Sequence, residues 1–195
     1  MNDATIFDPA DAPHVETDTD GGTITTTLDI AAPPERVFAA LTDPQELAAW
    51  WGSDDTYRTH DWAVDARPAG EWSARTIDPS GSEGSIHGRF TVVDRPSVLE
   101  STWHASWDEI DCTTVRYDLE PVIIDDTPGT RLTVTHTGFN GSTACASVAS
   151  YVSTLRTLVE FSATRRYSSV SYSSVAAEAL PDSSFLPLRF AFNTL

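Results

Sequence analysis

Two titratable side chains, His136 and Tyr117, fall on the apolar faces of segments that alternate as strands do. His136 follows Leu132 and Val134 at every second position, and Tyr117 follows Val115 in the same way. An imidazole can act as a base near neutral pH, and a phenol can donate a proton or a hydrogen bond. The structural alternative is a core histidine satisfied by the backbone and a tyrosine that packs by its ring. The sequence leaves both interpretations open.

Other kinds of catalytic or cofactor site have no signature in this sequence. Its five histidines and two cysteines show no HxxxH spacing and no paired cysteines, so we expect no metal site. No GxSxG turn marks a nucleophilic serine. No glycine-rich loop joins a strand to a helix, so we expect no nucleotide. We therefore assign no cofactor and no catalytic residue.

A pair of adjacent tryptophans, Trp50 and Trp51, ends a short predicted helix. Asp43 is a good N-cap, Pro44 suits the first helical position, and Glu46 completes a capping-box spacing. Helical geometry then places both indoles toward the same side. They could fill an ordinary core or line a ligand pocket, and we expect them to close the mouth of a pocket.

The segments between residues 57 and 136 predict an antiparallel sheet, because strands alternate with turn-rich breaks. One face is predicted to be apolar and to carry Trp72, Ala74, Ile86, Phe90, Val92, Leu99, Trp103 and Trp107. The opposite, solvated face is predicted to carry Arg75, His87, Arg89, His104, Arg116 and Arg131.

One helix is predicted before these strands in the sequence, and another is predicted after them. A short helix starts at Pro34, with Val37, Phe38 and Leu41 as its buried stripe. A long helix begins near Gly141, and its broad apolar stripe includes Val152 and Leu155. We expect a disordered acidic tail over residues 1–22, a domain over 23–163, and a C-terminal extension of unknown role over 164–195.

The charge balance excludes some partners. Twelve basic residues, all arginine, stand against 29 acidic ones, for a net charge of −17. Such a field repels nucleic acid and anionic membranes. The negative charge is consistent with an adaptation for solubility or, alternatively, with binding to a basic protein partner. With no signal peptide and no run of about 18 apolar residues, we expect a cytoplasmic protein with reduced cysteines.

Several local phrases resemble the START-like (SRPBCC) superfamily, and within it the family related to the activator of the heat-shock-protein-90 ATPase. They are "IAAPPERVFAALTDPQELAAWWG", "VDARPAGEW", "GRFTVVDRPSVLESTWHA" and "LTVTHTGF". The resemblance implies an α+β helix-grip fold, in which a curved antiparallel sheet wraps around a long C-terminal helix. It also implies an apolar cavity between the two.

We expect the protein to bind a small hydrophobic or aromatic molecule in that cavity. The expected ligand-binding residues are Phe38, Trp50, Trp51, Trp72, Phe90, Trp103, Tyr117, His136, Phe139, Val152 and Leu155. The resemblance leaves two alternatives, a co-chaperone-like activator that contacts a chaperone and a polyketide cyclase or aromatase. In the second, His136 would be the base and Tyr117 the proton donor, and both would have to face one cavity.

Overall fold

One antiparallel sheet organises the molecule. The structure, a computed structural model, describes residues 14–18, 22–53, 57–107, 112–139, 157–158 and 161. Within these residues, nine strands pair in the order β1-β2-β9-β8-β7-β6-β5-β4-β3. The strands are β1 (His14–Asp18), β2 (Thr23–Ile30), β3 (Gly52–Ser53), β4 (Tyr57–Val64), β5 (Glu71–Ile77), β6 (Glu83–Asp94), β7 (Val98–Ala105), β8 (Thr113–Ile124) and β9 (Thr127–Thr137).

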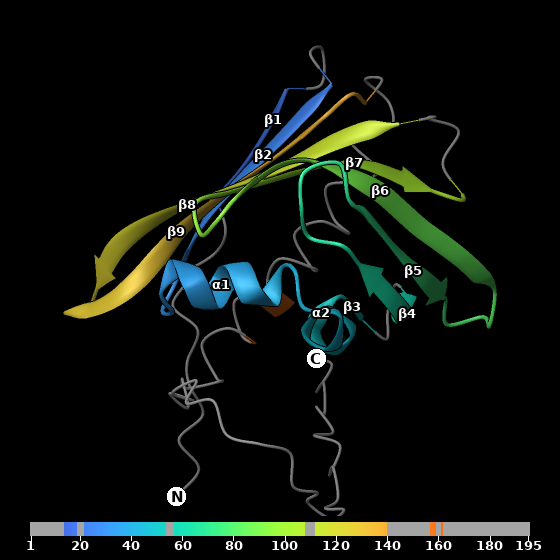
Figure 1. Cartoon of the computed structure of the whole chain (residues 1–195), viewed down its shortest axis with the longest axis horizontal. Helices are drawn as coiled ribbons and strands as arrows, with labels where there is room; N and C mark the ends of the chain where they lie inside the picture. Colours follow the sequence, from blue (N-terminus) through green and yellow to red (C-terminus); the bar gives the residue numbers. More distant parts are fainter. Residues whose placement is uncertain are drawn as a thin grey trace, which may run out of the picture.

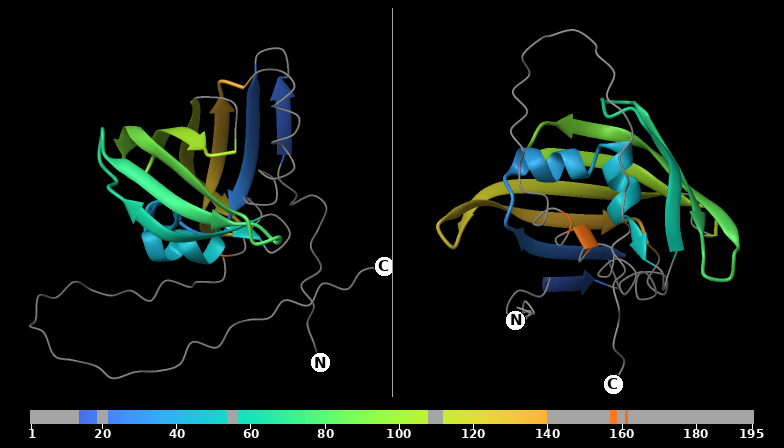
Figure 2. Two further views of the ribbon diagram at one scale, coloured as in Figure 1. Left: turned by 90° about the vertical axis from the view of Figure 1, so that its right-hand side faces the viewer. Right: turned by 90° about the horizontal axis from the view of Figure 1, so that it is seen from below.

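The sheet is strongly curved, and two short helices lie on its concave side (Figures 1 and 2). Strands β3 to β9 follow one another as a meander, and β2 pairs with the last strand, β9. The β8–β9 turn shows how local chemistry fixes this register. Asp125 and Asp126 both have positive φ, as a two-residue hairpin turn requires. The antiparallel sheet predicted from the sequence is therefore confirmed.

The two helices start and stop where the sequence predicts. Helix α1 (Pro34–Ala40) begins at Pro34 and buries Val37 and Phe38. Helix α2 (Pro44–Trp50) is capped by Asp43, whose carboxylate accepts hydrogen bonds from two backbone N–H groups of the first turn. Gly52, with φ of 101°, turns the chain into β3 immediately afterwards. The helices therefore interrupt the succession of strands and cover part of the concave face of the sheet.

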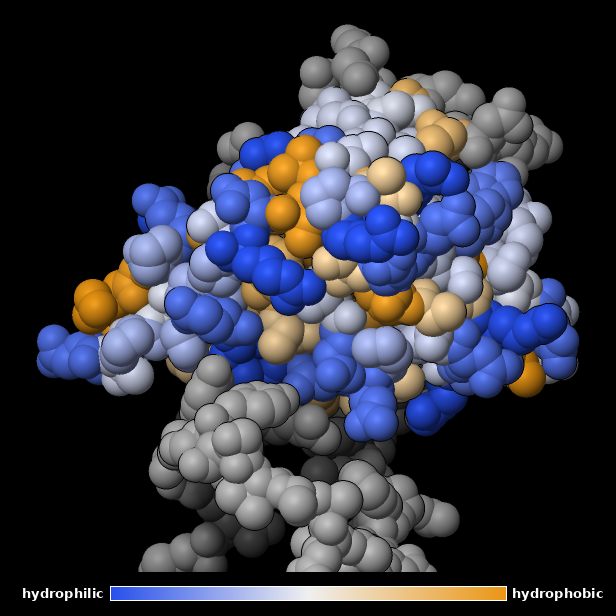
Figure 3. Space-filling view, viewed as in Figure 1, coloured by the Kyte–Doolittle hydropathy of each residue, from blue (hydrophilic) through white to orange (hydrophobic). Residues whose placement is uncertain are grey.

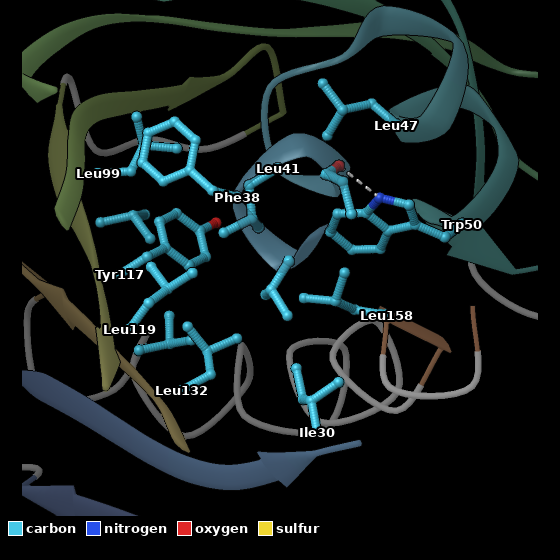
Figure 4. Packing of buried hydrophobic residues seen from close by; sticks show 14 of the residues in the cluster. Ile30, Phe38, Leu41, Leu47, Trp50, Leu99, Tyr117, Leu119, Leu132 and Leu158 are labelled. Atoms are coloured by element: carbon cyan, nitrogen blue, oxygen red, sulfur yellow. Dashed lines mark hydrogen bonds between the residues drawn. The ribbon is translucent and has the colours of Figure 1, made fainter. Parts of the chain in front are cut away.

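Trp50 belongs to the core beneath α1 and α2. Its side chain is 1% exposed, and its indole N–H donates to the Ala40 carbonyl at 2.9 Å. Figure 4 shows the indole between Leu47 and Leu158, with this hydrogen bond dashed. Because Ala40 ends α1 and Trp50 ends α2, the hydrogen bond ties the two helix ends together.

A buried ion pair also joins the two helices. Arg36 and Glu46 form a salt bridge with side chains only 8% and 18% exposed. The Arg36 guanidinium also lies over the ring of Phe161, 5.4 Å from its centroid. Thr157, Leu158 and Phe161 are helical, and Leu158 is fully buried in the core. The pair therefore links α1 and α2 to the helical residues around Phe161.

Replacing Glu46 with glutamine should destabilise the protein by about 3 kcal/mol, because it leaves the buried Arg36 charge without its counterion. Chemical denaturation would measure the change. Glu71→Gln is the matched control, since Glu71 pairs with Arg89 at an exposed site and should contribute little. Equal losses in the two variants would contradict the importance of burial.

The structure differs from the sequence predictions in three places. Residues 14–18, within the expected tail, form β1 and pair with β2. Trp107 is 51% exposed, because β7 ends at Ala105 and the chain turns before residue 107. Val92 was also placed wrongly: a register shift between Phe90 and Val92 pairs it with Glu100 on the outer face.

The long helix predicted from near Gly141 lies outside the described residues, apart from residues 157, 158 and 161. The same holds for the predicted extension over residues 164–195. Among the described residues, no helix combines the length and the apolar character needed to span a bilayer.

Candidate functional site

An apolar hollow lies where helices α1 and α2 meet the concave face of strands β4 to β8. Its floor comes from five consecutive strands and its rim from the end of α1, from α2 and from Trp51. The lining residues are Leu41, Leu47, Trp51, Trp62, Val64, Trp72, Phe90, Leu99, Ser101, Trp103, Val115 and Tyr117. We call this space the hollow.

The hollow encloses about 370 Å³ of space not filled by atoms, including the part that is open to solvent. The cavity itself has a volume of about 30 Å³, well below the roughly 300–1,000 Å³ of small-molecule sites. That space has room for only about two or three water molecules. A ligand larger than that must therefore extend through the open side or displace a lining side chain.

Four of the lining tryptophans form a closed ring of neighbours. Trp51 stacks on Trp103, with 5.5 Å between ring centroids and 14° between planes, and Trp62 stacks on Trp72 at 6.1 Å and 23°. Trp51 also contacts Trp62 at 5.5 Å, and Trp72 contacts Trp103 at 5.3 Å. We call these four residues the tryptophan ring. Such centroid distances are those of favourable aromatic pairs.

Trp62 reaches the ring because of an irregularity in β4. The β4–β5 register shifts between His60 and Ala63, and Asp61 has φ of 54°. This bulge reverses the alternation: Thr59 faces inward before it, and Trp62 faces inward after it. Trp62 is not among the ligand-binding residues expected from the sequence. The local pattern "DWAVD", in which Trp62 and Val64 alternate with smaller or charged residues, was the available signal.

Among the described residues that line the hollow, none has a charged side chain. Its polar side-chain groups are the hydroxyls of Ser101 and Tyr117 and the indole N–H groups of four tryptophans. Charged side chains instead lie on the outer face of the sheet, where Arg116 bonds Asp118 and Glu100. This is the face on which the sequence predicted Arg116. Figure 3 shows polar residues spread over the visible surface, with small apolar patches between them. The hollow thus suits an uncharged, mostly apolar occupant.

His136 lies beside the hollow, not in its lining. It is 2% exposed, its Nε2 and the Thr113 hydroxyl share a hydrogen bond of 2.7 Å, and the Phe139 ring lies 4.3 Å away. Burial lowers the pKa of His136 from 6.5 to about 3. The imidazole is therefore neutral at physiological pH and a weak base. Tyr117 lines the hollow, so the structure does not bring the two residues into one cavity.

The predicted ligand-binding residues fall into three groups. Trp51, Trp72, Phe90, Trp103 and Tyr117 line the hollow. Phe38, Trp50, His136 and Phe139 do not line it; the first two are core residues, and the last two contact each other. Val152 and Leu155 lie outside the described residues.

The adjacent tryptophans thus take different positions. Trp50 is buried under α1, whereas half-buried Trp51 lines the hollow. Among the described residues, no three His, Cys, Asp or Glu side chains cluster closely enough to hold a metal ion.

The sequence matches the model of a family described as Activator of Hsp90 ATPase homolog 1-like protein over residues 31–155, which is more than half of the chain. No curated protein is significantly similar to this sequence.

Several solved structures share the fold. Protein Ms6760 from Mycobacterium smegmatis is 21% identical and has a TM-score of 0.65, and the match covers 79% of this chain and 98% of that one. Protein CV1439 from Chromobacterium violaceum is 20% identical with a TM-score of 0.63, over 71% and 95% of the two chains. Protein NE0264 from Nitrosomonas europaea is 21% identical with a TM-score of 0.63, over 77% and 99%. At these identities the likeness establishes the fold alone.

Proposed function

Given that this chain belongs to the family of Activator of Hsp90 ATPase homolog 1-like proteins, we propose that its hollow binds a small hydrophobic or aromatic molecule. The observation that carries this proposal is the composition of the hollow, whose described residues combine aromatic and aliphatic walls with hydroxyl and indole N–H groups and carry no charge. Binding sites for small molecules have this composition. Trp51, Trp72, Phe90, Trp103 and Tyr117 would contact the ligand.

The proposed site extends to the helix predicted beyond Gly141. Leu158 and Phe161 are helical and pack against the core, which supports a helix that faces the concave side of the sheet. Val152 and Leu155 belong to the same predicted stripe and would complete the wall of the site. We propose a domain that includes β1, before the start expected at residue 23, and extends to about residue 163 in a cytoplasmic protein, with the ligand between the sheet and this helix.

A ligand retained through purification would be the most direct support. Native mass spectrometry of freshly purified protein should show a mass above that of the chain, which mild organic extraction then removes. A protein that carries no such mass should still bind a neutral fluorescent probe such as N-phenyl-1-naphthylamine. Absence of binding across a broad panel of apolar and aromatic compounds would refute the proposal.

Filling the hollow should abolish this binding. Ser101 is 5% exposed and lines the hollow, so Ser101→Leu would place an isobutyl group in the space that the probe needs. We expect the affinity for N-phenyl-1-naphthylamine to fall at least about tenfold, because each displaced methylene contact costs roughly 1 kcal/mol. Fluorescence titration below the melting temperature measures it.

Ser73→Leu is the matched control, since Ser73 is exposed on β5, next to the buried Trp72. It should leave the affinity unchanged. If both substitutions, or neither, weakened binding, the probe would not occupy the hollow.

Activation of an Hsp90-type ATPase is a second candidate function. The family match favours it, and the net charge of −17 would complement a basic surface on a chaperone. A steady-state ATPase assay with the chaperone of the same host tests it directly. The absence of stimulation at saturating protein would exclude this role and leave ligand binding unaffected.

A further inference from the structure

Two hydrogen-bond donors of the tryptophan ring are buried without a partner. The indole N–H groups of Trp62 and Trp72 have no hydrogen-bond acceptor among the described residues. Two other indoles differ in this respect, since Trp50 donates to the Ala40 carbonyl and Trp51 to the Tyr57 hydroxyl. A buried donor without an acceptor destabilises the protein, so such groups in native structures require an explanation.

We propose that the hollow selects a neutral, planar aromatic molecule with an acceptor oxygen at its edge, which accepts hydrogen bonds from Trp62 and Trp72. This inference rests on the proposed function and specifies its ligand class. A carbonyl oxygen is a suitable acceptor, because it has two lone pairs and no charge. A carboxylate would lose its hydration in a lining whose described residues include no cation, and the net charge of −17 would repel it.

The position of the Trp72 donor depends on the glycine beside it. Gly88 pairs with Trp72 across β5 and β6, and a Cβ at position 88 would lie 2.7 Å from the Trp72 Nε1. The absence of a side chain there leaves room for the indole nitrogen beside β6. The donor is thus positioned by packing and makes no hydrogen bond to the described residues.

The shape of the ligand follows from the stacking in the tryptophan ring. Trp51 and Trp103 present nearly parallel faces, and aromatic rings prefer offset stacking on such a surface. Trp51 follows the end of α2 and is half-buried, whereas Trp50 anchors that helix through its hydrogen bond to Ala40. Trp51 can therefore move while α2 stays in place, although the movement breaks its 3.4 Å hydrogen bond to the Tyr57 hydroxyl. A planar ligand would displace Trp51 from Trp103 and stack on the exposed indole.

Fluorenone and fluorene test this inference as a matched pair, because they share one tricyclic skeleton and only fluorenone has a carbonyl oxygen. Equilibrium dialysis against the full chain should show fluorenone binding at least about tenfold more tightly than fluorene, as expected for two added hydrogen bonds. Trp62→Phe and Trp72→Phe should each reduce this preference about threefold, and the double variant should eliminate it.

Fluorene serves as the internal control, since the phenylalanine variants keep an aromatic wall and should still bind it. Trp107→Phe, at an exposed position outside the ring, should leave both affinities unchanged. Equal binding of the two compounds, or a preference that survives in the double variant, would overturn the inference while apolar binding stands. If neither compound bound, the inference and the proposed binding of aromatic ligands would both fail.

Discussion

Trp50→Ala should lower the free energy of unfolding by about 4 kcal/mol. This loss should be larger than that caused by the same substitution at the adjacent Trp51. Trp50 is 1% exposed, so the substitution opens a large cavity in the core. It also removes the hydrogen bond to the Ala40 carbonyl, which joins the ends of α1 and α2. Urea denaturation followed by circular dichroism would measure the change through the midpoint at constant slope.

Trp51→Ala is the matched control for Trp50→Ala. Trp51 is half-buried at the hollow, so its loss should cost less stability, about 1–2 kcal/mol, and should mainly weaken the binding of an aromatic probe. Trp50→Phe, which keeps a ring but no N–H donor, should lie between Trp50→Ala and the native protein. Equal losses of stability at positions 50 and 51 would contradict the division between core and hollow.

The second large effect concerns pH. The free energy of unfolding should fall by about 2 kcal/mol between about pH 7.5 and pH 5 because of His136 alone. Its pKa is about 3 in the folded protein, below the ordinary value of 6.5 that applies in the unfolded chain. Between these two values the unfolded chain binds a proton that the folded protein does not. Stability is therefore fully present above the unfolded pKa and is lost as the pH falls toward 3.

Denaturation of the native protein and of His136→Gln across this range isolates the contribution of His136. The variant loses packing and its bond to Thr113, so the comparison uses the slopes against pH and not the absolute stabilities. The slope of the native protein should exceed that of the variant above about pH 5, where most carboxylates are still ionised. Identical slopes would show that His136 titrates normally in the folded state.

The low pKa of His136 also bears on the enzymatic alternative. A general base works best when its pKa lies near the operating pH, and His136 is far below it. Tyr117 lines the hollow and His136 does not, so the cyclase arrangement lacks the shared cavity that it requires. The binding proposal needs neither residue to transfer a proton.

The local elements were predictable from the sequence, because they depend on neighbouring residues. Pro34 and Asp43 set the starts of α1 and α2 through a fixed φ and an N-cap hydrogen bond. Alternation predicted the inward faces of β5 and β8, including Trp72 and Tyr117. Together with the family phrases, these patterns predicted the curved sheet and five of the residues that line the hollow.

Tertiary structure decided which side chains meet, since strand register and burial depend on residues distant in the sequence. The bulge at Asp61 shifts the pairing with β5 and turns Trp62 into the tryptophan ring. Helical spacing put Trp50 and Trp51 on one side, but only the packing of α2 against α1 buries the first and leaves the second at the hollow. Likewise, alternation placed His136 on the apolar face, whereas its low pKa results from the burial that the complete fold imposes.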